Sequence, residues 1–189
     1  MIRINVREIT GLDTLAGKVG GLRDFPKFVA ALEETPSGST VFLDWSGVEI
    51  STASYLGTTF VPLLRMAMAG ELDRYFVVCG MNKTCLDEFK LVLELQGLVA
   101  LVGNLGRDGL VHNVQVLGTL DLAYTKTLDA VQHVNLATAS QLHKRDAQTH
   151  TRIGKTAWIN RLSKLHRLRL VRKQRIGREY VFQTVSEEN

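Results

Sequence analysis

The stretch TRIGKTAWINRLSKLHRLRLVRKQRIGREYVF, residues 151–182, joins a helical pattern to two strand-like runs. Apolar residues recur at spacings of three and four, which predicts one packing face on a helix over about 151–168; they are Trp158, Ile159, Leu162 and Leu165. After this helix, residues 170–182 form two β-rich runs around Ile176-Gly177, which is typical of a hairpin. The stretch therefore predicts a long helix followed by a hairpin with a basic tip.

Two shorter helices are expected upstream of this stretch. Leu128, Val131 and Val134 share a helical spacing, which predicts a helix near 127–136. Thr138 or Ser140 can cap a second, short helix that carries Leu142. A polar turn at 146–150 would separate this helix from the long one. The expected order is helix, helix, longer helix and hairpin.

This order, within about 65 residues, resembles the winged helix-turn-helix family. The most specific part is 162–171, LSKLHRLRLV, which looks like the junction between that family's recognition helix and the first strand of its wing. The family commonly has a glycine before the Leu-Val pair, where a left-handed residue ends the helix, and this chain has Arg169. The resemblance implies that the long helix enters the major groove of double-stranded DNA.

The residues expected to contact DNA lie on this helix and on the hairpin. Four of them share helical spacing, namely Lys155, Thr156, Asn160 and Lys164. Asn160 is the candidate for reading adenine, because its amide both donates and accepts hydrogen bonds. Arg152, Lys155 and Lys164 are expected to hold phosphates, and Arg175 and Arg178 to reach the minor groove or its backbone. The alternative for each is a solvated side chain on an amphipathic helix or an exposed turn.

Charge is unevenly divided along the chain. Residues 1–120 contain 10 Lys and Arg against 13 Asp and Glu, and residues 121–189 contain 13 against 6. The net charge of +4 therefore conceals an acidic first part (−3) and a basic second part (+7). A basic nucleic-acid module joined to a different domain would have this distribution, although an ordinary basic surface would too.

Strand and helix patterns alternate over the first 120 residues. Strands are expected near 2–8, 41–45, 75–79, 98–102 and 111–117, and helices near 25–34, 52–69 and 84–96. The glycines at 17, 20 and 21 are interpreted as loop residues before the first helix. In the 52–69 helix the inward residues are expected to be Leu56, Phe60, Leu63, Leu64 and Ala67. The alternation predicts an α/β sandwich with helices over a sheet.

Residues 41–60 carry a second resemblance. VFLDWSGV at 41–48 and SYLGTTF at 54–60 look like the STAS family and its STAS-like relatives, in which an acidic residue ends a strand and Ser-aromatic-Leu starts a helix. In anti-sigma-factor antagonists of that family a serine at this helix start is phosphorylated by a partner kinase. The resemblance implies a phospho-switch or partner site at Ser54, although the Asp and Gly that flank the family's serine are missing. Ser54 as a helix cap is the alternative.

Few features indicate an enzyme or a bound cofactor. The five histidines show no metal-site spacing, and Gly154-Lys155-Thr156 lacks the earlier glycine of a phosphate-binding loop. Asp44 at a strand end is expected to fix a loop or bind a partner. We expect no catalytic residues, no metal and no cofactor. Cys79 and Cys85 are expected to be reduced and buried, and without an apolar run long enough to span a membrane or a signal peptide the protein is expected to be cytoplasmic.

Together these patterns predict an α/β protein with a STAS-like domain over 1–121 and a small winged-helix domain over 122–189. The expected function is sequence-specific binding of double-stranded DNA in transcription regulation, with the STAS-like domain sensing a signal, forming a homodimer or docking a protein such as a kinase or an anti-sigma-like factor. The alternative is an interaction adaptor in a partner-switching or multiprotein system, whose winged helix binds protein.

Overall fold

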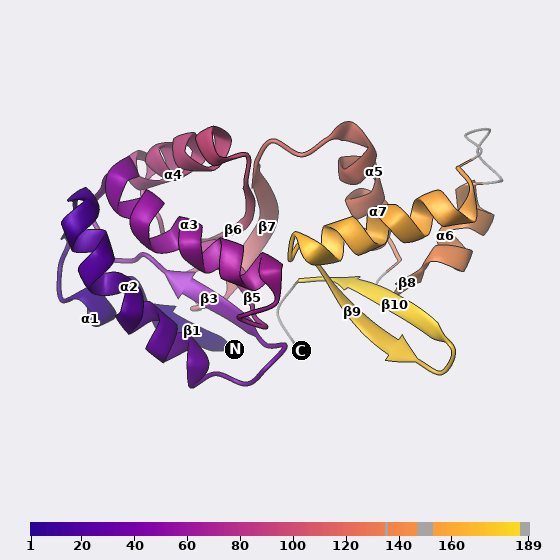
Figure 1. The fold of residues 1–189 in the computed structure, drawn as a ribbon, viewed down its shortest axis with the longest axis horizontal. Coiled ribbons are helices and arrows are strands. Elements are labelled where there is room, and N and C mark those ends of the chain that lie inside the picture. Colours follow the sequence, from indigo (N-terminus) through magenta and orange to yellow (C-terminus); the bar gives the residue numbers. More distant parts are fainter. Residues whose placement is uncertain (135, 147–152, 186–189) are drawn as a thin grey trace. The chain divides into compact units, whose positions relative to one another are not determined.

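The computed structural model describes residues 1–134, 136–146 and 153–185, which form a mixed α/β structure. The chain divides into two compact units, Met1–Thr119 and Leu120–Val185 (Figure 1). Each unit has its own sheet.

The N-terminal unit is built on a five-stranded sheet. Its strands, in spatial order, are β1 (Ile2–Asn5), β3 (Thr40–Asp44), β5 (Tyr75–Cys79), β6 (Val99–Leu105) and β7 (Val111–Gly118). The first four run parallel, and β7 pairs with β6 in the antiparallel direction. A small parallel pair, β2 (Thr14–Leu15) and β4 (Ile50–Ser51), lies apart from this sheet. The central strands are continuous apolar runs, as expected of parallel strands that are buried on both faces.

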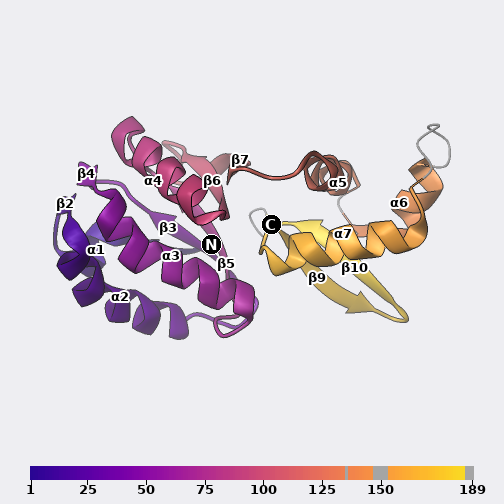
Figure 2. The same cartoon turned by 45° about the horizontal axis from the view of Figure 1, so that its top comes forward.

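Helices cover one face of this sheet. The unit contains α1 (Val6–Thr10), α2 (Gly17–Glu33), α3 (Ala53–Ala69) and α4 (Lys83–Gln96). Figures 1 and 2 show α3 between α2 and α4. Alternate strand residues such as Val41 and Val78 join Phe28, Phe60 and Phe89 in one core cluster. Burial of each large apolar side chain contributes about 2 kcal/mol, so this contact fixes the helices on the sheet.

The start of α2 differs from the sequence expectation. The expected loop glycines lie inside the helix, which begins at Gly17 and not near Phe25. A Cβ atom on Gly21 would overlap the hydroxyl of Thr58 and lie 2.9 Å from the backbone oxygen of Tyr55. Glycine is therefore required because α2 and α3 approach each other closely here, a reason that local sequence does not reveal.

The first strand is also shorter than expected. β1 ends at Asn5, whose side chain accepts a hydrogen bond from the backbone N–H of Glu8 at 3.0 Å. This cap starts α1, and Gly11 ends it with a φ of +72°. The expected strand over 2–8 is thus a strand followed by one short helix.

The C-terminal unit combines three helices with a three-stranded antiparallel sheet. In chain order its elements are α5 (Leu122–Gln132), β8 (Ala137–Thr138), α6 (Ala139–Asp146), α7 (Lys155–Arg167), β9 (Val171–Ile176) and β10 (Glu179–Thr184). The strand order is β8-β10-β9. The buried apolar residues include Leu128, Val131, Leu142, Trp158 and Phe182, so every helix and the hairpin contribute to this core.

Side-chain caps set where two of these helices begin. Asp121 accepts a hydrogen bond from the N–H of Ala123 at 2.8 Å, and α5 therefore begins five residues before the expected start. Thr138 and Gln141 cap α6 reciprocally: Thr138 Oγ1 accepts from the Gln141 N–H, and Gln141 Oε1 accepts from the Thr138 N–H. Of the two expected caps for α6, Thr138 is the correct one.

Replacing Gly21 by alanine tests the close approach of α2 and α3. We expect Gly21→Ala to lower the free energy of unfolding by about 1–3 kcal/mol, because the added methyl group overpacks the contact with Thr58 and Tyr55. Gly57→Ala is the matched control, since a Cβ there has open space within the helix α3. That change should be neutral or stabilise by up to about 1 kcal/mol. Chemical denaturation of both variants measures the difference, and equal effects would contradict the packing role of Gly21.

Candidate nucleic-acid interface

Helix α7 has one buried face and one exposed face. Trp158, Leu162 and Leu165 are at most 5% exposed and hold the helix against the core of its unit. Ile159, predicted on the same packing face, is 44% exposed, so that part of the prediction is wrong. Thr156 and Asn160 are exposed on the opposite side. A helix turns by about 100° per residue, so the partly exposed Lys164 lies at one edge of that outward face, whereas Lys155 follows the line of Trp158 and Leu162 and is exposed because it is the first residue of the helix. The four residues expected on α7 are therefore all at least partly accessible, but Lys155 does not share the face of Thr156, Asn160 and Lys164.

The sequence interpretation missed Arg167. It is exposed and lies seven residues, or two helical turns, after Asn160. The spacing that grouped Thr156 with Asn160 also points to Arg167, so this signal was present in the sequence. Arg152, expected to hold a phosphate, lies outside the described residues.

The hairpin extends the basic surface. β9 and β10 pair from Val171↔Thr184 to Ile176↔Glu179 and are joined by the two-residue turn Gly177-Arg178. Gly177 has a φ of +62°, as the first central position of a type II′ turn requires. Arg175 and Arg178 are exposed at this tip, and the Arg175 Nε atom donates to the Gly177 carbonyl at 3.3 Å.

A cation-π contact supports the hairpin behind its tip. The Lys173 Nζ atom lies 3.9 Å from the centre of the Tyr180 ring. The register pairs Arg175 with Tyr180 across the two strands, so both cations stand on the same face of the hairpin as this ring. Lys173 was not among the residues expected from the sequence.

The segment that forms this surface carries only positive formal charges. From Lys155 to Arg178 the sequence contains nine Lys and Arg residues and no Asp or Glu. The first acidic residue after this segment is Glu179, whose Oε1 atom accepts a hydrogen bond from the Ser140 hydroxyl at 2.8 Å. Both α7 and the hairpin therefore attract anions without a competing carboxylate inside the segment.

The junction between α7 and β9 is a Schellman motif. The N–H of Arg169 donates to the His166 carbonyl, and the N–H of Leu170 donates to the Leu165 carbonyl. Arg169 has a φ of +61°, a left-handed conformation that side chains other than glycine rarely adopt. The arginine that stands in place of the expected glycine thus keeps the backbone conformation that glycine would have.

Replacing Arg169 by glycine should relieve this backbone conformation. We expect Arg169→Gly to raise the free energy of unfolding by about 1 kcal/mol, since left-handed backbone costs roughly 1–2 kcal/mol in other residues. Arg167→Gly is the control, because a glycine in the last helical turn should destabilise by about 0.5–1 kcal/mol. Thermal unfolding monitored by circular dichroism measures both. A destabilised Arg169→Gly variant would show that the arginine side chain outweighs the backbone cost.

In the N-terminal unit, Ser54 is exposed in the first turn of α3. Thr52 caps this helix: its Oγ1 atom accepts from the N–H of Tyr55 at 3.4 Å and from that of Gly17 at 3.1 Å. The interpretation of Ser54 as the helix cap is therefore wrong. The Glu88 carboxylate accepts from the Ala53 N–H at 3.0 Å, so an anion already occupies this helix start.

Two buried carboxylates in this unit have structural partners. Asp24 contacts Arg23 and Lys27 at 2.8 Å each and accepts from the Tyr55 hydroxyl at 3.3 Å. Burial alone would raise the pKa of Asp24, but the donors from Arg23 and Lys27 outweigh it and the pKa is lowered. Asp44 accepts from the Ser46 N–H at 2.8 Å and thereby fixes the loop after β3.

The cysteines are both buried and unpaired with each other. Burial, together with the nearby Asp44 carboxylate, raises the pKa of the Cys79 thiol to about 12, so this thiol stays protonated at neutral pH. Within residues 1–134, 136–146 and 153–185, no group of three or more His, Cys, Asp or Glu side chains is arranged to hold a metal ion.

None of the helices in the described part of the chain has the length and apolar character that crossing a membrane requires. Comparisons of the chain with protein-family models, with curated proteins and with solved structures found no match.

Proposed function

We propose that the C-terminal unit is a winged helix-turn-helix domain that binds double-stranded DNA in a sequence-specific manner, and that the protein regulates transcription. The observation that carries this proposal is the exposed polar face of α7, which continues into a basic hairpin without an acidic residue from Lys155 to Arg178. The order of three helices and a hairpin supports it, because winged helices use their third helix and their hairpin to contact DNA.

In this proposal α7 lies in the major groove, which is wide enough to admit a helix. The Asn160 amide pairs with the edge of an adenine, which presents one donor and one acceptor there. Lys155 in the first turn of α7 and Lys164 at the edge of its exposed face contact phosphates, and Arg167 adds a further contact at the helix end. Arg175 and Arg178 at the hairpin tip reach the adjacent minor groove or its backbone.

We further propose that the N-terminal unit is a STAS-like domain that senses a signal, forms a homodimer or docks a protein partner. The support is the parallel sheet with helices over one face, together with the Asp44-to-Ser54 segment that leads from β3 into α3. Its residues carry the acidic excess of the chain, so this unit is not expected to bind phosphates.

Selection of duplexes from a random pool, followed by titration of the selected duplex, tests the DNA proposal. Asn160→Ala should weaken binding to the selected duplex by about 10- to 100-fold and should leave binding to unrelated DNA nearly unchanged. Arg167→Ala should weaken both and reduce the slope of log K against log salt by about 1. Arg107→Ala, an exposed arginine in the N-terminal unit, is the control and should change neither. Absence of duplex binding at low salt, or full binding by a Lys155/Asn160/Lys164 triple alanine variant, would contradict the proposal.

The second candidate function is docking of a protein partner by the same surface. Three large apolar side chains are exposed there: Ile159 on α7 (44%), and Ile176 and Tyr180 on the hairpin (51% each). Apolar groups contribute more to protein interfaces than to phosphate contacts. Ile159→Glu and Ile176→Glu should abolish a protein contact that withstands added salt, whereas a DNA contact should be lost with salt.

We also propose Ser54 as a phospho-switch or partner site, addressed by a kinase or an anti-sigma-like protein. Its exposure in the first turn of α3 makes the hydroxyl accessible, and Glu88 beside that turn makes a second anion unfavourable. A negative charge at 54 would therefore compete with the Glu88 carboxylate for the helix start.

A double-mutant cycle between Ser54 and Glu88 tests this arrangement. The change in the free energy of unfolding caused by Ser54→Asp should be about 0.5–1 kcal/mol more favourable in the Glu88→Gln background than in the unchanged chain. The reason is that Glu88→Gln removes the negative charge that would repel Asp at position 54. Light scattering should show a changed oligomeric state or partner binding for Ser54→Asp and none for Ser54→Ala. Additive free energies together with an unchanged oligomeric state and unchanged partner binding would rule out the switch.

A further inference from the structure

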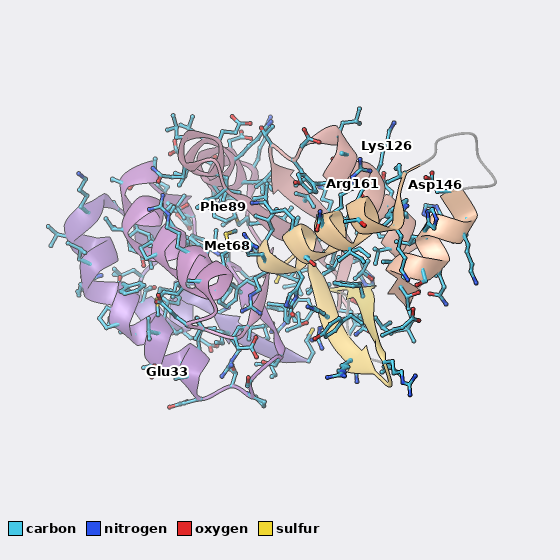
Figure 3. The ribbon with its side chains drawn as sticks, turned by 45° about the vertical axis from the view of Figure 1, so that its right-hand side comes forward. Glu33, Met68, Phe89, Lys126, Asp146 and Arg161 are labelled. Atoms are coloured by element: carbon cyan, nitrogen blue, oxygen red, sulfur yellow. The ribbon has the colours of Figure 1, made fainter. Side chains whose placement is uncertain are left out.

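A hollow of about 560 Å³ lies within the C-terminal unit, on the side of α7 that faces α5. Residues from α5, from the end of α6 and from α7 line it, and Figure 3 labels one charged side chain from each of these helices: Lys126, Asp146 and Arg161. Its volume falls within the range of small-molecule sites, roughly 300–1,000 Å³. None of the residues proposed above to contact DNA lines this hollow.

The wall of the hollow is largely apolar. Leu122, Ala130, Ile153 and Trp158 contribute to it, and Leu122 is 67% exposed in spite of its size. Trp158 is almost completely buried, and its indole N–H has no hydrogen-bond acceptor in the described structure. A buried donor without an acceptor costs free energy. The wall therefore offers an aromatic surface, apolar side chains and an indole N–H without an acceptor in the described structure.

The charged residues around the hollow are not equivalent. Both carboxylates accept hydrogen bonds from the backbone: Asp121 from Ala123 and Asp146 from Ile153, each at 2.8 Å. Lys126 and Arg161, in contrast, form no salt bridge with any residue of the described structure within 4.0 Å. The hollow is thus lined by two cations without carboxylate partners in the described structure and by two carboxylates that each accept a backbone hydrogen bond from a neighbouring wall residue.

We propose that this hollow binds a small organic anion with an apolar or aromatic body. The anionic group would lie between Lys126 and Arg161, where charge-assisted hydrogen bonds are available, and the apolar body would cover Trp158 and Ala130. The site does not rest on the proposed DNA contact, because it uses different residues of α7. Since Trp158 and Arg161 belong to α7, an occupant would contact the helix whose outward face carries Asn160.

Phenylacetate is a suitable probe, with phenylacetamide as its neutral match and inorganic phosphate as an anion without an apolar body. The chain has two tryptophans, so a Trp45→Phe variant assigns the indole N–H signals in a ¹H–¹⁵N spectrum. Phenylacetate should shift the Trp158 indole signal in a saturable manner, with an apparent Kd about ten-fold lower than that of phenylacetamide. Phosphate should not shift it to saturation.

Substitutions in the wall test whether phenylacetate binds in this hollow. Lys126→Gln and Arg161→Gln should each weaken phenylacetate binding by about three- to ten-fold, and Ala130→Leu should abolish it by filling the hollow. Lys144→Gln on α6, which does not line the hollow, is the control and should leave binding unchanged. A Trp158 signal that does not respond to phenylacetate, equal affinities for the acid and its amide, or wild-type binding by Arg161→Gln and Ala130→Leu would each overturn the proposal. These measurements use no DNA, so their failure is separate from a failure of the proposed function.

Discussion

Burial of one face of α7 is the constraint on which the C-terminal unit depends. Trp158, Leu162 and Leu165 hold this helix against α5, α6 and β9 at once, so the helix cannot rotate without exposing all three. The burial of each of these side chains contributes about 2 kcal/mol to the free energy of unfolding. Every polar feature of α7 follows from this anchoring, because Asn160 and Arg167 are outward only while Trp158 is inward.

The same anchoring divides the polar residues of α7 between two surroundings. Arg161 stands at the hollow beside α5, whereas Asn160, one residue earlier, is exposed and does not line it. Adjacent residues on a helix point about 100° apart, so neighbouring positions serve different surfaces. The acidic and basic parts of the chain show a comparable separation at the scale of the two units.

Sequence patterns predicted the elements whose signal is local. The apolar run at Tyr75–Cys79 coincides with β5, and the expected inward residues of α3 are all buried. Both predictions were correct because the spacing of apolar residues along a helix or strand marks the side chains that become buried. The glycines of α2 were misread, since their reason is the neighbouring helix α3, which is distant in sequence. Asn160 and Lys155 were found at exposed positions, but Arg167 was missed although its spacing was available. The hollow beside Trp158 had no sequence signal, because residues from three helices form it.

The Schellman motif at Arg169 has a consequence for how α7 and the hairpin act together. A junction closed by two backbone hydrogen bonds has little freedom, so the direction of β9 is set as soon as α7 is placed. In the proposed DNA complex the helix and the hairpin would act as two rigidly joined contacts, in which the first contact raises the effective concentration of the second. Within the proposed DNA complex, the ordering cost of the hairpin is met during folding and not during binding. Affinity would therefore depend on the geometry of this joint as much as on the number of cations that it presents.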